Sequence, residues 1–83
     1  MKRQNTASKD MIQDFAELKK QGVKHFLVTT TTDTKTYTPV VKSTAQGVSS
    51  YANKMYRKYG DDTKVEVGYF DSNCEYNIYC TYG

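Results

Sequence analysis

The sequence predicts an α+β fold, a two-layer sandwich with the element order α-β-β-α-β-β. Two stretches place apolar residues at helical spacing between start and stop residues, which indicates two helices. Four other stretches are rich in β-branched and aromatic residues and are separated by polar turns, which indicates two hairpins. The 83 residues suffice for a single small domain, 1–83, so we expect a four-stranded, mainly antiparallel sheet with both helices on one face.

The first predicted helix covers residues 8–21. Ser8 or Thr6 can cap its start, and Gly22 can end it in a left-handed conformation. Its apolar side comprises Met11, Ile12, Phe15, Ala16 and Leu18. The preceding residues, 1–7, are polar and basic, and we expect them to be flexible.

A hairpin is predicted to follow. Residues 23–31, VKHFLVTTT, are typical of a central strand because the apolar block within them indicates burial on both faces. Residues 32–34 form a plausible turn, and residues 35–41 form the second strand. Pro39 cannot donate a hydrogen bond to a neighbouring strand, so we expect this second strand to lie at an edge of the sheet or to end irregularly.

The second helix is the element that the sequence predicts most clearly, over residues 43–60. Ser43 and Gln46 fit a capping box, and Gly60 is placed to end the helix. One continuous apolar stripe runs along it: Ala45, Val48, Ala52, Met55, Tyr56 and Tyr59. We expect this stripe to hold the helix against the sheet.

The last hairpin is predicted from strict alternation. Residues 63–70 and 74–82 form its strands, and residues 71–73 form its turn. The alternation places Tyr76, Ile78, Cys80 and Tyr82 on one face of the last strand, with Glu75, Asn77, Tyr79 and Thr81 on the other. Alternation of this kind is typical of an antiparallel hairpin with one solvated face.

Catalytic and metal-binding patterns do not emerge from the sequence. Cys74 and Cys80 both lie in the last predicted strand, about 20 Å apart, which is too far for a disulfide, so we expect two reduced thiols. The chain has one histidine, His25, and no CxxC pair, so we expect no metal site and no cofactor. No nucleophile stands beside a base, and we expect no enzymatic activity.

Charge is distributed unevenly along the chain. Residues 1–60 contain eleven Lys or Arg and four Asp or Glu, whereas residues 61–83 contain one and five, so the balances are +7 and −4. Such asymmetry concerns binding partners rather than fold. No 18-residue apolar run and no cleavable leader are present, so we expect a cytoplasmic protein that does not enter a membrane.

The outer face of the second helix is the main candidate for partner binding. At 100° per residue, the side opposite the apolar stripe carries Gly47, Ser50, Tyr51, Lys54, Arg57 and Lys58. The small residues would let a partner approach closely, and the basic residues would meet phosphates or an acidic protein patch. The alternative is an ordinary solvated helix face.

Aromatic residues form a second candidate contact. The chain has eight tyrosines and no tryptophan, and Tyr37, Tyr79 and Phe70 are candidate secondary contacts on the sheet or its rim. Tyrosine offers large, rigid contact area at interfaces. The alternative is that tyrosine is simply a favourable strand residue.

In layout, the chain resembles small single-domain proteins of bacteriophages and mobile elements, of the anti-CRISPR or host-modulating type. The resemblance rests on residues 37–41, 43–60 and 65–82. It implies a non-enzymatic protein that docks on and occludes a larger protein or ribonucleoprotein, such as a CRISPR effector, in the cytoplasm of a bacterial host. The alternative is a small DNA- or RNA-binding regulator that uses the basic second helix. Homodimerisation through the edge strand 35–41 also stays open.

Overall fold

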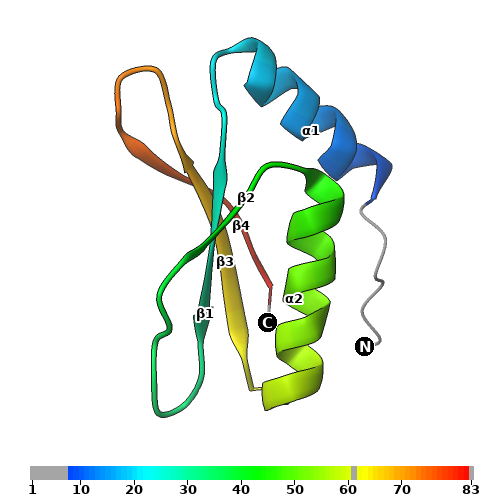
Figure 1. Cartoon of the computed structure of the whole chain (residues 1–83), viewed down its shortest axis with the longest axis vertical. Coiled ribbons are helices and arrows are strands. Elements are labelled where there is room, and N and C mark those ends of the chain that lie inside the picture. Colours follow the sequence, from blue (N-terminus) through cyan, green and yellow to red (C-terminus); the bar gives the residue numbers. More distant parts are fainter. Residues whose placement is uncertain (1–7, 61, 83) are drawn as a thin grey trace.

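The computed structural model describes residues 8–60 and 62–82. Its elements follow the predicted order: α1 (Lys9–Lys20), β1 (Phe26–Thr31), β2 (Val40–Lys42), α2 (Ala45–Tyr59), β3 (Lys64–Phe70) and β4 (Tyr76–Tyr82). The strands form one antiparallel sheet in the order β2-β1-β3-β4, and both helices lie on the same side of it (Figure 1). The predicted two-layer α+β sandwich is therefore confirmed.

Helix α1 starts and ends where the sequence predicts. The Ser8 hydroxyl accepts a hydrogen bond from the Met11 amide at 3.2 Å, and Gly22 follows the helix with a φ of 103°, which suits a residue without a Cβ. The buried face is narrower than expected, because it consists of Met11 and Phe15, whereas Ile12 is 52% exposed. Helix α1 thus contacts the core mainly through these two side chains, which lie one helical turn apart.

The predicted capping box at the start of α2 is wrong by one residue. Thr44, not Ser43, is the cap, and its hydroxyl accepts a hydrogen bond from the Gly47 amide at 3.0 Å. The Gln46 side chain donates forward to the Ser50 hydroxyl at 2.8 Å. Both Ser and Thr are preferred N-cap residues, with Ser ranked slightly higher, so two adjacent candidates do not fix the start of the helix to one residue.

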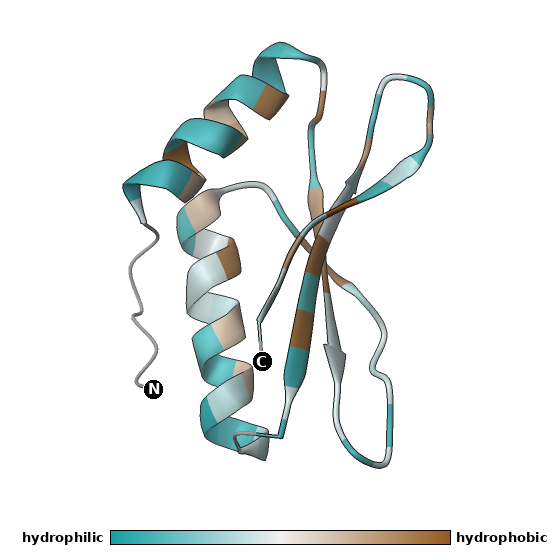
Figure 2. Ribbon diagram, turned by 180° about the vertical axis from the view of Figure 1, so that it is seen from behind, coloured by the Kyte–Doolittle hydropathy of each residue, from teal (hydrophilic) through white to brown (hydrophobic). Residues whose placement is uncertain are grey.

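The core lies between α2 and the centre of the sheet. The Phe15 ring from α1 stacks on Phe26 of β1, with ring centroids 3.8 Å apart. Figure 2 shows apolar residues along the middle of the sheet, beside α2. The buried apolar residues are Met11, Phe15, Val23, Phe26, Val28, Ala45, Val48, Ala52, Met55, Tyr56, Val65 and Val67. The predicted stripe of α2 is confirmed, with Tyr59 partly buried at its end.

The second predicted strand is shorter than expected, although its edge position is confirmed. Only Val40–Lys42 pair continuously with β1. Before them, the Tyr37 amide donates to the Thr30 carbonyl at 2.9 Å, and Thr36 forms a single bridge with Thr31. Pro39 stands between these two pairings and has no amide hydrogen to offer, so the ladder is interrupted there.

The predicted alternation along the last strand is wrong for its first half, because β4 contains a bulge. Val67 pairs with Cys80 but Gly68 pairs with Ile78, which leaves Tyr79 as the extra residue. The bulge reverses the facing of the residues before it. Tyr76 and Ile78 therefore lie on the face away from the helices, while Tyr79, Cys80 and Tyr82 contact the helix-side core.

The turn between β3 and β4 is held by one carboxylate. Asp71 accepts hydrogen bonds from the amides of Asn73 and Glu75, at 2.9 and 3.0 Å, and from the Asn77 side chain at 2.9 Å. These bonds, that of Asn77 first, lower the pKa of Asp71 below its usual 3.8. Cys74 lies in this turn with a φ of 62°, not in the strand as predicted, and both cysteines are free thiols.

Substitution on the two faces of α2 tests the helix phase. Ala52 is 2% exposed, so Ala52→Arg places a charge in the core and should cost at least about 4 kcal/mol, enough to unfold a small domain. Lys54 is exposed, and Lys54→Ala should change stability by no more than about 0.5 kcal/mol. Urea unfolding followed by circular dichroism measures both, and equal costs would show that the phase is wrong.

The Asp71 turn should make stability depend on pH in the acid range. Because the pKa of Asp71 is lower in the folded state, its contribution is present above about pH 4 and is lost as the pH falls through the folded pKa. Asp71→Asn should flatten this part of the acid dependence of the melting temperature. Asp33→Asn, an exposed carboxylate in the turn of the first hairpin, is the matched control; an equal flattening there would contradict the assignment.

Candidate binding surfaces

The outer face of α2 brings together all six residues predicted for partner binding. We call them the basic face: Gly47, Ser50, Tyr51, Lys54, Arg57 and Lys58. Lys54, Arg57 and Lys58 are exposed, and Tyr51 is half-buried at the flank. The Lys42 amine lies 5.1 Å from the centroid of the Tyr51 ring, a cation–π distance, so positive charge continues from α2 onto the edge strand β2.

Three lysines on and beside the basic face, Lys42, Lys54 and Lys58, form no ion pair within the described ranges. Within residues 8–60 and 62–82, no carboxylate lies at ion-pair distance from Lys42, Lys54 or Lys58. An ion pair does join Lys20 and Glu17 on α1, at 3.9 Å. The charges of Lys54 and Lys58 on α2 are therefore available to a partner rather than neutralised within the fold.

A second surface, on the side of the sheet away from the helices, was not predicted as a site. We call it the open sheet face: Leu27, Val41, Phe70, Tyr76 and Ile78. The last four are between 42% and 59% exposed, an unusual exposure for large apolar side chains gathered on one face. Strand register aligns Val41, Leu27, Gly68 and Ile78 in one row across the four strands. The bulge that creates this grouping has no signal in the sequence.

Tyr76 is fixed on the open sheet face by two neighbours. Its hydroxyl donates to a Glu66 carboxylate oxygen at 3.0 Å, and its ring meets Phe70 edge-on with centroids 5.4 Å apart. The ring lies over Gly68, where a Cβ would overlap it. Burial and the neighbouring Glu66 charge raise the pKa of Tyr76 to about 12.

Of the three predicted secondary contacts, only Phe70 lies on the open sheet face. Tyr79 points to the helix side, where its hydroxyl donates to the Asp14 carboxylate at 2.7 Å and its ring packs edge-on against Phe15. Burial, followed by the Asp14 hydrogen bond, raises the pKa of Tyr79. Tyr79 thus joins β4 to α1, a role inside the fold.

Tyr37 also has a neighbour within the fold. It stacks on Tyr59 with centroids 5.1 Å apart, and a hydrogen bond between the two hydroxyls raises the pKa of Tyr37 and lowers that of Tyr59. The amines of Lys35 and Lys58 lie over these rings. The pair lines a polar pocket of about 280 Å³ with Thr32, Asp33, Thr34, Asp62 and Thr63. The ring faces are already covered by one another and by lysines, which leaves no free aromatic face for a ligand.

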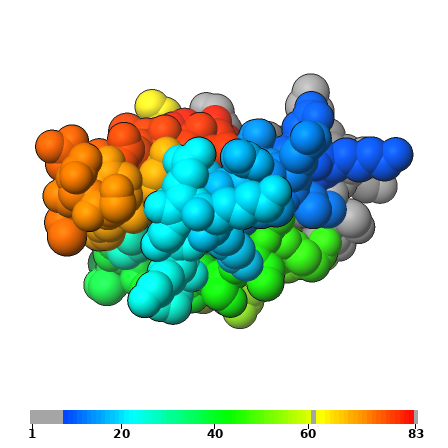
Figure 3. Space-filling view, turned by 90° about the horizontal axis from the view of Figure 1, so that it is seen from above, coloured from blue at the N-terminus to red at the C-terminus, as the bar shows by residue number. Residues whose placement is uncertain are grey.

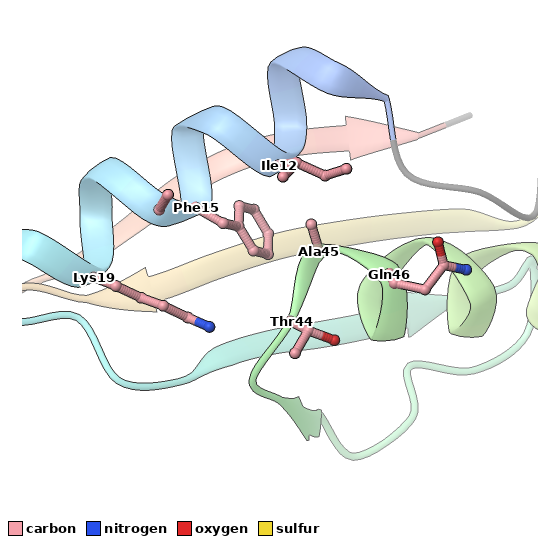
Figure 4. A pocket seen from close by; sticks show the side chains of 7 residues that line it. Ile12, Phe15, Lys19, Thr44, Ala45 and Gln46 are labelled. Atoms are coloured by element: carbon pink, nitrogen blue, oxygen red, sulfur yellow. The ribbon is translucent and has the colours of Figure 1, made fainter.

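A shallow groove separates α1 from the start of α2. Its volume is about 330 Å³, and its walls are Ile12, Phe15, Ala16, Lys19, Thr44, Ala45 and Gln46. Figure 4 shows Phe15 and Ile12 reaching from α1 toward Ala45, so the floor is apolar. Two residues of its α1 wall, Ile12 and Ala16, are exposed, although the sequence predicts them on the apolar side of the helix.

Within residues 8–60 and 62–82, no three His, Cys, Asp or Glu side chains are grouped so as to hold a metal ion. Neither α1 nor α2 has the length and hydropathy that a transmembrane span requires. His25 is exposed at the start of β1.

Comparison with known proteins adds no relative. No protein-family model matches the chain, and no curated protein or solved structure is significantly similar to it. The two surfaces therefore have to be interpreted from their own chemistry.

Replacement of Gly68 tests the arrangement on the open sheet face. Gly68→Ala should displace the Tyr76 ring and break its bond to Glu66, so the pKa of Tyr76 should fall from about 12 toward its usual value of 10.0. Carbon-13 NMR of the tyrosine rings measures this titration residue by residue. The pKa of Tyr79, on the other side of the sheet, should stay raised; an unchanged Tyr76 titration would contradict the geometry.

Proposed function

We propose that this chain is a non-enzymatic binding protein that docks through the basic face on an acidic surface of a larger protein or ribonucleoprotein. The observation that supports this most is that two exposed lysines on one side of α2, Lys54 and Lys58, have no carboxylate at ion-pair distance in the described ranges. Lys42 of the neighbouring strand β2 has none either. A rigid helix is a suitable carrier, because it holds these charges in fixed relative positions.

The residue types of the basic face change along the helix, from small residues near its start to lysines near its end. Ser50, near the start of α2, is small and exposed and permits close approach of a partner, whereas the Lys42 and Thr44 side chains already lie against Gly47. Tyr51 offers aromatic contact area, and the Lys42 amine lies against its ring. Lys54 and Lys58 follow toward the end of the helix and supply charge. Apolar contact and charge on the same face give both affinity and orientation.

Two acidic residues of the last hairpin are distant from the basic face, whereas Asp62 follows shortly after the end of α2. Asp71 and Glu75 lie in the turn between β3 and β4, at the opposite end of the molecule from the last turn of α2 (Figure 1). Seen from above, this turn also projects away from both helices (Figure 3). Separation of opposite charges would steer a partner to one side of the protein and oppose wrapping around it.

Occlusion is the mode of action that we propose, with a ribonucleoprotein such as a CRISPR effector in a bacterial cytoplasm as the partner class to test first. The resemblance in layout to small phage-encoded inhibitors motivates this choice. Bare nucleic acid is the competing ligand, because lysine and arginine neutralise phosphates as readily as carboxylates.

Charge reversal on α2 tests the proposal. The triple variant Lys54→Glu, Arg57→Glu and Lys58→Glu should stay folded, because all three side chains are exposed, and should bind at least about tenfold more weakly. The measurement is affinity capture from bacterial lysate, with half of the lysate treated with nuclease. A protein retained after nuclease treatment indicates protein docking, and loss of all capture indicates nucleic acid.

The matched control reverses three exposed lysines elsewhere: Lys9→Glu, Lys19→Glu and Lys24→Glu. It changes the net charge by the same amount but leaves α2 intact, so capture should persist. Equal capture by the α2 variant and the wild type would rule out the basic face as the docking surface.

A further inference from the structure

We propose that the open sheet face is a homodimer interface, on which a second copy of this chain packs its own open sheet face. The face is one side of a four-stranded sheet whose other side is covered by α1 and α2 (Figure 1). Two such sheets packed face to face would place the helices outside and the exposed apolar residues of both copies in the middle.

The first argument is apolar area. Val41, Phe70, Tyr76 and Ile78 are each about half exposed, and side chains of this size have roughly 150–200 Å² of surface, so together they expose about 350 Å². A single apolar patch of this size is at the scale that marks interaction sites on small proteins. Four strands of up to seven residues span about 19 by 23 Å, so two opposed copies would bury on the order of 1,000 Å².

The second argument is charge, which selects a second copy as the occupant. A two-fold interface places each surface against itself, so a strongly charged surface repels its copy whereas a nearly neutral one does not. On the open sheet face β3 carries one charge of each sign: Glu66, which accepts the Tyr76 hydroxyl, and Lys64 two residues before it. The basic face, with three exposed cations, would repel its own copy.

The third argument is that the sheet edges are poor alternatives. Strand β2 has three residues and follows Pro39, and β4 carries its bulge at Tyr79, the middle of its seven residues. Short edges, proline and bulges are features that oppose edge-to-edge pairing. The edge strand 35–41, considered from the sequence as a dimer contact, is therefore a weaker candidate than the open sheet face.

Dimerisation by this face would leave both basic faces accessible. Each α2 lies on the far side of its sheet from the interface, so the dimer would present two copies of the basic face on opposite sides. A partner with two acidic sites, or two partners, could then be bound at once.

The experiment is sedimentation velocity of the purified chain over a concentration series. An interface of this area is expected to dissociate in the micromolar range, so the mass should rise from 9.5 kDa toward twice that value between about 1 and 500 μM. Ile78→Lys should keep the protein at 9.5 kDa throughout this range. Val41→Lys, on a different strand of the same face, should also keep the protein monomeric. It replaces Ile78→Lys in the test if that variant does not fold.

The matched control is Ile12→Lys, the same substitution at a similarly exposed position on α1, which should dimerise like the wild type. A wild type that stays at 9.5 kDa up to about 500 μM would overturn the proposal. Folded Ile78→Lys and Val41→Lys variants that dimerise as the wild type does would also overturn it, since the contact would then lie elsewhere.

Discussion

The packing of the apolar stripe of α2 against the centre of the sheet is the contact on which the rest of the structure depends. Val48 and Ala52 lie fully buried against β1 and β3, whose inward residues Val28 and Val67 are also buried. Helix α1 adds Phe15, stacked on β1, and is tied to β4 through the hydrogen bond from Tyr79. Because the chain has only these two helices in the described ranges and both cover one side, the other side of the sheet has no cover.

This constraint leaves two outward surfaces of different chemistry. The far side of α2 is basic, because the helix period places its lysines opposite the apolar stripe. The far side of the sheet is apolar and nearly neutral, because the bulge at Tyr79 turns Tyr76 and Ile78 outward. A basic surface attracts acidic partners and repels its own copy, whereas a neutral apolar surface can pair with itself. The two surfaces therefore fit two different occupants without competing for space.

The fold could be predicted from the sequence because helical period, β-branched runs and glycine stops all agree. The features that could not be predicted are set by contacts between elements. Thr44 rather than Ser43 caps α2, and the second strand shrinks to Val40–Lys42 beyond Pro39. The basic face was predictable because it depends on the period of one helix. The open sheet face could not be predicted, because a one-residue bulge moves every earlier residue of the strand to the opposite face. Tyrosine occurs on buried and exposed faces of sheets, so its position gives no sign of the bulge.

Amide NMR spectra in two series test the division of the surface most directly: dilution of the protein alone, and addition of polyglutamate as an acidic probe. Dilution should change the amide chemical shifts of β1, β3 and β4 and should leave those of α2 unchanged. Polyglutamate should change the amide chemical shifts around Lys54 and Lys58 and should leave those of β4 unchanged. Dilution shifts on α2, or shifts on the same elements in both series, would contradict the account.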